Sequence, residues 1–370
     1  MRTWGISLLA ALLFVSIGST VKASADKGEY LVGFETGVGE NRQTDIASRI
    51  GSVEHEFQYM NVLEMNIPSK AVQALENNPN VAFVEKNKDV EISAEYIPWG
   101  VDYVEAPSIQ ETGITGQGAD VAVLDTGISD NHFDLTVTGG ESFISYEPSP
   151  FEDGNGHGTH VAGTIAALDN GSGLIGVANN TQLHAVKVLD SSGSGSLSTI
   201  IKGIEWSISN DMDIVNMSLG TASGAESLEM ASDNAEEEGI FMVGAAGNSG
   251  TDGANNTIGY PARYDSVMAI GSIDRYEDRS SFSSVGEELE VMAPGSSITS
   301  TYPGQNYATL SGTSMAAPHV SGAAALMLDQ NPSLSNEEIR LQLNNTADPA
   351  GDSFYYGNGI IDLPEAIESE

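Results

Sequence analysis

Short apolar runs alternate with amphipathic stretches along most of the chain beyond residue 94. The apolar runs include "VAVLD" at 121–125, "LHAVKV" at 183–188, "DIVNMSL" at 213–219, "IFMVGAA" at 240–246 and "VMAIGSI" at 267–273. Helical patterns separate some of them, for example at 197–210 and 225–239. Short, nearly continuous apolar strands are typical of parallel sheets that are covered on both faces. We therefore predict one α/β domain over residues 94–370, with a mostly parallel sheet, helices on both faces and right-handed crossovers.

Residues 26–93 show a different order of patterns. Strands are predicted at 29–34, within 54–67 and at 81–93, and helices at 40–51 and 69–80, with Ser69 as the N-cap of the second helix. The order β-α-β-β-α-β is typical of a small ferredoxin-like α+β domain.

The first 25 residues have the pattern of a secretory signal peptide. Arg2 precedes an apolar run from Ile6 to Ile17, and the small residues Ala23 and Ala25 follow it. The alternative, an uncleaved membrane anchor, is disfavoured because the apolar run is short for a bilayer span. No other stretch is long and apolar enough to cross a membrane, so we expect a secreted, extracellular protein without a membrane segment after signal cleavage.

Composition narrows the functional classes. The absence of cysteine excludes disulfides, thiolate metal sites and a cysteine nucleophile. With 52 acidic residues against 14 Lys and Arg, the net charge of −38 argues against nucleic-acid binding. Only six of these basic residues lie beyond Ala94: Lys187, Lys202, Arg263, Arg275, Arg279 and Arg340. A surface this acidic is screened at high salt, which suggests a halophilic protein; an ordinary soluble acidic protein is the alternative.

Three separate stretches carry candidate chemistry. Asp125 ends a predicted buried strand, His157 lies where the glycine-rich loop "DGNGHGTH" enters a helix, and Ser314 stands in "SGTSMAAPHVSG" before an alanine-rich helix. Each has an ordinary explanation when taken alone: a turn aspartate, a loop histidine and a helix N-cap serine. Together they offer a nucleophile, a base of suitable pKa and a carboxylate to orient the base.

The blocks "VLDTGI", "GHGTHVAG" and "GTSMAAPHVSG", in the order Asp, His, Ser, resemble the three catalytic blocks of the subtilisin family of serine proteases. The resemblance covers nearly all of residues 94–370 and extends to the pro-region of secreted bacterial subtilisins. It implies that Ser314 is the nucleophile, His157 the general base and then acid, and Asp125 its orienting partner. Asn248 would be the side-chain donor of the oxyanion hole. We expect Pro318 within the first turn of the helix, where its missing N–H costs little.

The same resemblance implies a substrate site. "SLGTASG" at 218–224 would pair with an extended substrate and form one wall of the S1 pocket, while "GAAGN" and Gly259 would form the rest. Because glycines and alanines leave that pocket wide, we expect broad specificity with a preference for large apolar or aromatic P1 residues. The implied substrate-binding residues are Ser218, Leu219, Gly220, Ala245, Gly247, Gly259, Leu197 and Ile200.

A calcium site is also implied, since "ALDNGSGLIGV" resembles the calcium loop of the family. The implied ligands are Glu95, Asp134, Leu168, Asn170, Ser172 and Leu174, which offer the oxygen atoms that Ca²⁺ prefers. A flexible Asn-Gly loop without an ion is the alternative.

By the same resemblance, residues 26–93 would be a pro-domain that assists folding and inhibits the enzyme until autocleavage near Ser93–Ala94. Protein or peptide substrates and the pro-domain are the expected partners, and we expect a monomer. The competing hypothesis is a catalytically silent relative that acts as a binding module.

Overall fold

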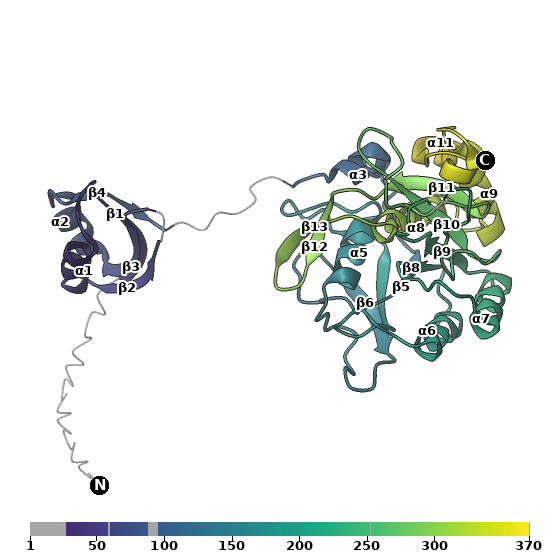
Figure 1. Ribbon diagram of the computed structural model, residues 1–370, viewed down its shortest axis with the longest axis horizontal. Coiled ribbons are helices and arrows are strands. Elements are labelled where there is room, and N and C mark those ends of the chain that lie inside the picture. The colour runs from purple at the N-terminus through teal and green to yellow at the C-terminus, as the bar shows by residue number, and fades with distance from the viewer. Residues whose placement is uncertain (1–26, 58–59, 88–94, 252, 370) are drawn as a thin grey trace, which may run out of the picture. The chain divides into compact units, whose positions relative to one another are not determined.

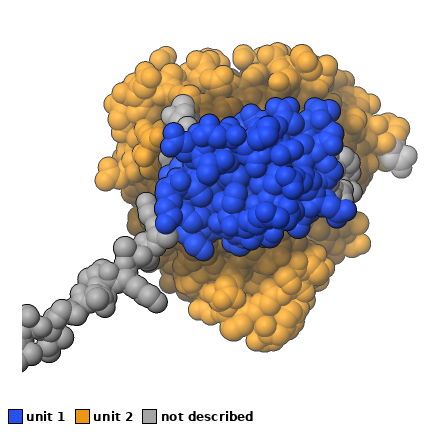
Figure 2. Space-filling model, turned by 90° about the vertical axis from the view of Figure 1, so that its left-hand side faces the viewer, with its two compact units in different colours: residues 1–91 blue, residues 92–370 orange. Residues whose placement is uncertain are grey.

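A computed structural model describes residues 27–57, 60–87, 95–251 and 253–369. The contacts divide the chain into two compact units, residues 1–91 and 92–370, which have different colours in Figure 2. The predicted signal peptide and the predicted cut near Ser93–Ala94 lie outside the described residues.

The first unit is a four-stranded sheet with two helices. Its elements are β1 (Lys27–Phe34), α1 (Glu40–Ser48), β2 (Ser52–Glu56), β3 (Val62–Pro68), a 3₁₀ turn (Ser69–Ala71), α2 (Val72–Glu76) and β4 (Val81–Lys86). The strand order β2-β3-β1-β4 with antiparallel neighbours confirms the ferredoxin-like prediction. The second helix differs from its prediction. Ser69 lies in the 3₁₀ turn that follows β3 directly, and the α-helix begins only at Val72.

The second unit is built on a seven-stranded sheet in the order β11-β10-β9-β8-β5-β7-β6, and every neighbouring pair is parallel. The strands are β5 (Asp120–Asp125), β6 (Val137–Ser142), β7 (Gln182–Lys187), β8 (Ile214–Met217), β9 (Phe241–Ala245), β10 (Met268–Ile273) and β11 (Leu289–Pro294). A separate hairpin joins β12 (Ile298–Tyr302) to β13 (Asn306–Leu310).

Helices cover both faces of this sheet (Figure 1). They are α3 (Trp99–Tyr103), α4 (Ala106–Gln110), α5 (His157–Ala166), α6 (Leu197–Ser209), α7 (Glu226–Glu237), α8 (Thr313–Gln330), α9 (Asn336–Thr346), α10 (Ser353–Tyr356) and α11 (Leu363–Glu368). The pleat of β5 separates two cores, because successive strand side chains point to opposite faces. Val121 and Val123 pack with α5 and α8, whereas Ala122 and Leu124 pack with α6 and α7. The α/β prediction is thus confirmed.

The strands that follow β5 in the chain are added first on one side of it and then on the other. β6 and β7 lie on one side of β5 and β8 to β11 on the other. In open parallel sheets, ligands bind beyond the carboxyl ends of strands at such a switch point. Asp125 is the last residue of β5 and therefore lies at this position.

Candidate active site

Asp125 and His157 form a hydrogen-bonded pair at the carboxyl edge of the sheet. Asp125 is fully buried, and its two carboxylate oxygens each lie 2.9 Å from His157 Nδ1. The Thr126 backbone N–H donates a further bond of 2.7 Å to Asp125 Oδ1. A buried carboxylate is stable only with such partners. Gly158 is required beside the pair, because a Cβ there would lie 2.2 Å from the Gly127 carbonyl oxygen.

The pair holds a proton on the imidazole more tightly than an isolated histidine would. Burial disfavours the charged ring, but the Asp125 and Asp153 carboxylates outweigh this effect and raise the pKa of His157 above its usual range. One nitrogen of the ring is thereby committed to Asp125. The other, Nε2, is the atom that could accept a proton from a nucleophile.

Ser314 is the second residue of α8, whose N-terminal cap is Gly312. The Ser314 hydroxyl donates to the Ser218 carbonyl oxygen at 3.1 Å, and the Ser218 hydroxyl donates to the Ser314 carbonyl oxygen at 2.8 Å. This reciprocal pair ties the start of α8 to the segment that follows β8.

Pro318 is not in the first turn of α8, as the sequence led us to expect. It lies inside the helix, in the second turn. A residue at this position would normally donate its N–H to the carbonyl of Ser314, four residues earlier, and proline has no N–H. The Ser218 hydroxyl therefore satisfies the carbonyl that Pro318 leaves without a helical donor.

Asn248 follows β9 and contacts the start of α8. Its side-chain oxygen accepts from the Thr313 N–H at 3.0 Å and from the Thr313 hydroxyl at 3.2 Å. Since the oxygen is held this way, the NH₂ end of the amide is the part available to donate to a developing negative charge.

Two adjoining cavities, of about 470 and 460 Å³, bring the predicted residues together. Both are lined by Leu219, Gly220 and Thr221. The first also has His157, Leu197, Ile200 and Ser218 in its wall, and the second Ala245, Gly247, Asn248, Gly259 and Ser314. All eight predicted substrate-binding residues thus line these two cavities, which share the segment 219–221 and are together called the cleft.

The predicted calcium ligands also lie together, around the loop that follows α5. Asp134 is buried and accepts from Asn170 Nδ2 at 3.0 Å and from the Leu174 N–H at 2.7 Å. Glu95 Oε1 accepts from the backbone N–H of Asn170 at 2.9 Å. Burial and the nearby Asp169 carboxyl raise the pKa of Glu95. The remaining predicted ligands, Leu168 and Ser172, belong to the same loop.

Within the part of the chain that the structure describes, no group of three or more His, Cys, Asp or Glu side chains is arranged to hold a metal ion. A calcium ion at this loop would therefore depend mostly on backbone and amide oxygens. Nor do the described ranges contain a helix with the length and apolar character needed to span a bilayer.

Comparison with known proteins decides the family. Residues 116–359 match the model of the subtilase family, Peptidase_S8. The chain is 46% identical to Subtilisin J of Geobacillus stearothermophilus over 379 aligned positions, which cover 99% of both chains. It is also 46% identical to the thermostable alkaline protease of Halalkalibacterium halodurans, over 98% of both chains. Subtilisin DY of Bacillus licheniformis is 55% identical, and all of it aligns with 74% of this chain.

The chain belongs to the subtilase family. It is accordingly a serine endopeptidase of the subtilisin type, as its three blocks led us to expect, and the alternative of a silent binding module is not supported.

Asp153 shapes this subtilase site and was missed by sequence reasoning. Asp153 is buried in the loop before α5 and accepts from the Thr126 hydroxyl at 2.8 Å, the Gly156 N–H at 2.7 Å and the Thr159 N–H at 2.9 Å. It thus holds the loop that presents His157. Its place before "GNGH" was the only available signal, and that context reads equally well as an ordinary turn.

Proposed function

We propose that this subtilase is a secreted endopeptidase that cleaves peptide bonds through an acyl-enzyme on Ser314. The observation that carries the proposal is the buried Asp125 carboxylate, with both oxygens 2.9 Å from His157 Nδ1, at the cleft that Ser314 and Asn248 also line. This arrangement offers a base whose orientation and protonated form are both stabilised.

In the proposed reaction His157 Nε2 removes the proton of the Ser314 hydroxyl as its oxygen attacks the scissile carbonyl. Negative charge then develops on the carbonyl oxygen, where the Asn248 amide and the backbone N–H groups at the start of α8 can stabilise it. The protonated imidazole, stabilised by Asp125, gives its proton to the leaving amine. A water molecule then gives a proton to His157 and attacks the acyl ester on Ser314. His157 returns the proton to the Ser314 oxygen as the carboxylic acid product is released.

A serine-directed fluorophosphonate tests this assignment. We expect it to label the parent enzyme at Ser314 and to abolish hydrolysis of a peptide anilide. Ser314→Ala should prevent labelling and lower kcat by roughly 10⁶-fold, a loss known from nucleophile removal in subtilisin itself. Ser311→Ala, three residues earlier, is the matched control and should be labelled normally. Labelling of the Ser314→Ala variant would refute the assignment.

We propose a preference for large apolar or aromatic P1 residues. The small residues Ala245, Gly247 and Gly259 leave the second cavity wide, which supports this preference. The exposed backbone at Ser218–Gly220 suits strand addition, which depends little on side chains and hence favours broad specificity. Gly259→Val should narrow the pocket and shift cleavage of a mixed peptide library towards smaller P1 residues.

Residues 26–93 are proposed to act as a pro-domain that aids folding, inhibits the enzyme and is removed by autocleavage near Ser93–Ala94. The compact first unit and the alignment of all of Subtilisin DY with 74% of this chain support a shorter mature form. N-terminal sequencing of the secreted product should place the new terminus close to Ala94. The Ser314→Ala variant should stay uncut if the cleavage is self-inflicted.

Ca²⁺ is the proposed ligand of the loop around Asp134 and Asn170. The donor chemistry fits, because the group consists of carboxylate, amide and backbone oxygens, and the adjacent carboxyls of Glu95 and Asp169 would gain from a nearby cation. The ion would stabilise the loop and take no part in peptide hydrolysis. Calorimetric titration with Ca²⁺ should show binding that Asp134→Asn removes, while Asp130→Asn, in the same connection, should bind as the parent does.

Secretion, a monomeric state and tolerance of high salt complete the proposal. Export rests on the signal-like first 25 residues, and salt tolerance on the net charge of −38. Faster loss of activity in several molar NaCl than in dilute buffer would overturn the halophilic assignment, and gel filtration would reveal an oligomer.

A further inference from the structure

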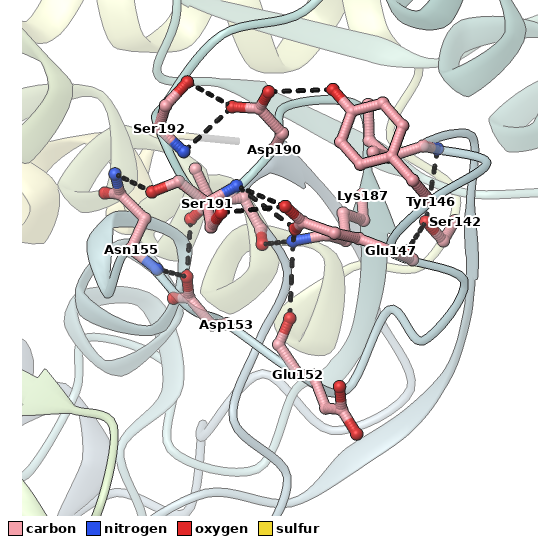
Figure 3. A network of polar contacts seen from close by, with 12 residues as sticks. Ser142, Tyr146, Glu147, Glu152, Asp153, Asn155, Lys187, Asp190, Ser191 and Ser192 are labelled. Atoms are coloured by element: carbon pink, nitrogen blue, oxygen red, sulfur yellow. Dashed lines mark hydrogen bonds and ion pairs between the residues drawn. The ribbon is translucent and has the colours of Figure 1, made fainter.

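Lys187 is a fully buried cation that the proposed reaction does not use. It is the last residue of β7, and its neighbour in the sheet register is Asp125. Its ammonium group donates to the carbonyl oxygens of Thr126 and Glu152 and pairs with Glu147 Oε2 at 2.9 Å (Figure 3). A lysine is almost never buried without such partners. Lys187 therefore holds together the segment after Asp125 and the loop that leads to His157.

Local hydrogen bonds hold the backbone of Glu147 in place, independently of its pairing with Lys187. The Ser142 hydroxyl donates to its backbone carbonyl at 2.7 Å, and its own N–H donates to the Ile144 carbonyl at 2.9 Å. The hydrogen bond and charge of Lys187 lower the pKa of Glu147, so its carboxylate is ionised at neutral pH.

The same carboxylate reaches a third segment. Its oxygens accept from the Ser191 N–H at 3.1 Å and from the Ser191 hydroxyl at 2.8 Å. Ser191 belongs to the connection Leu189–Gly195, here called the rim loop, in which Leu189, Gly193, Ser194 and Gly195 line the first cavity. Glu147 thus links the wall of the cleft to the buried charge beneath it.

Two further bonds tie the rim loop to the same side (Figure 3). The Tyr146 hydroxyl donates to Asp190 Oδ2 at 2.9 Å, and Asn155 Nδ2 donates to the Ser191 carbonyl at 3.1 Å. Both partners are more exposed than the Lys187 ammonium group. Glu147 differs from Tyr146 and Asn155 because it accepts both donors of Ser191 and is itself paired with the fully buried Lys187. We therefore take its carboxylate as the principal anchor of the rim loop.

We propose that Glu147 and Lys187 are positioning residues that set the affinity of the cleft for extended substrates by holding the rim loop in place. This inference rests on the proposed function, because it takes the first cavity as the place where substrate residues before P1 bind. Without the Glu147 carboxylate, the rim loop loses both side-chain contacts of Ser191 with Glu147 and its link to the buried Lys187. An extended substrate must then order the loop itself, which weakens binding. A substrate too short to reach the loop does not bear that cost.

Two substrates of the mature enzyme separate these effects: a tetrapeptide anilide with an aromatic P1 residue and a single-residue aromatic ester. Glu147→Gln should raise KM for the tetrapeptide by about ten-fold, while KM and kcat for the ester stay within about two-fold of the parent. The matched control is Glu141→Gln, which removes the same charge at an exposed position in β6. It should leave KM and kcat for both substrates unchanged.

The outcomes are distinct. If the parent cleaves neither substrate, the proposed function itself fails. If the parent cleaves both, and Glu147→Gln changes neither or weakens both equally, the positioning role is overturned. Should Glu147→Gln fail to fold, Ser191→Ala provides the test: it removes one tether, keeps the Lys187 pair, and should raise KM for the tetrapeptide alone. An unchanged tetrapeptide KM in Ser191→Ala would then refute the proposal.

Discussion

Ser218→Ala should lower both the stability of the fold and kcat, because Pro318 provides no helical donor for the Ser314 carbonyl and the Ser218 hydroxyl supplies one instead. The substitution removes the donor to the Ser314 carbonyl and the acceptor of a 2.9 Å bond from Asn216 Nδ2. Ser218 and Asn216 are buried, so water cannot readily replace either bond. Each unsatisfied buried group costs about 1–3 kcal/mol, and we expect the free energy of unfolding to fall by about 3 kcal/mol. The loosened nucleophile should lower kcat by about ten-fold with little change in KM.

Pro318→Ala tests the mechanism of that loss. It restores a backbone N–H that can donate to the Ser314 carbonyl from within α8, and this should matter more when the Ser218 hydroxyl is absent. In a double-mutant cycle, Pro318→Ala should be about 1 kcal/mol more favourable in the Ser218→Ala background than in the parent. Denaturant unfolding in a Ser314→Ala background avoids self-digestion, and kcat is measured with Ser314 present. Strictly additive effects of the two substitutions would refute the reasoning.

Three further predictions concern the pH profile of the reaction, the stability that one ion pair contributes, and the effect of salt on that contribution. Because Asp125 and Asp153 raise the pKa of His157 in the free enzyme, kcat/KM should fall as pH drops through a value above the usual 6.5 for histidine. Asp125→Asn should move this limb of the pH profile to lower pH and reduce kcat by about 10⁴-fold, and an unmoved limb would contradict the assignment. Arg340→Met should lower the free energy of unfolding by about 3 kcal/mol, because it breaks a two-bond pair with the partly buried carboxylate of Glu290 at 2.6 and 2.9 Å. The loss caused by Arg340→Met should be nearly the same in dilute and in molar salt, because partly buried ion pairs are weakly screened. The parent, by contrast, should gain stability with salt. A loss of stability in Arg340→Met that is confined to dilute buffer would contradict this prediction.

The elements that could be predicted were those with local signals. β5 and β7 to β10 were recognised because their side chains are apolar on both faces. The edge strand β6 did not stand out, since its sequence "VTGGES" is half exposed and rich in glycine. Its place depends on pairing with β7, a contact between distant segments that no local pattern encodes.

The same distinction holds at the site. Asp125, His157, Ser314 and Asn248 were found because each lies in a short distinctive block. Glu147 and Lys187 act through partners far away in the sequence. Asp153 bonds mainly to nearby residues, and in its own surroundings it looks like an ordinary turn aspartate. Pro318 was misplaced by one turn, because the beginning of α8 is set by the contacts of Thr313 with Asn248 rather than by the helix sequence.

The burial of Lys187 has a practical consequence for handling the enzyme. Residues 94–370 contain only two lysines, and the other, Lys202, is exposed on α6. If residues 1–93 are removed as proposed, an amine-acylating reagent applied to the folded remainder should modify Lys202 and the new amino terminus and spare Lys187. Coupling to an activated resin at a pH that favours one of these amines would immobilise the molecules in a uniform orientation without any engineered tag.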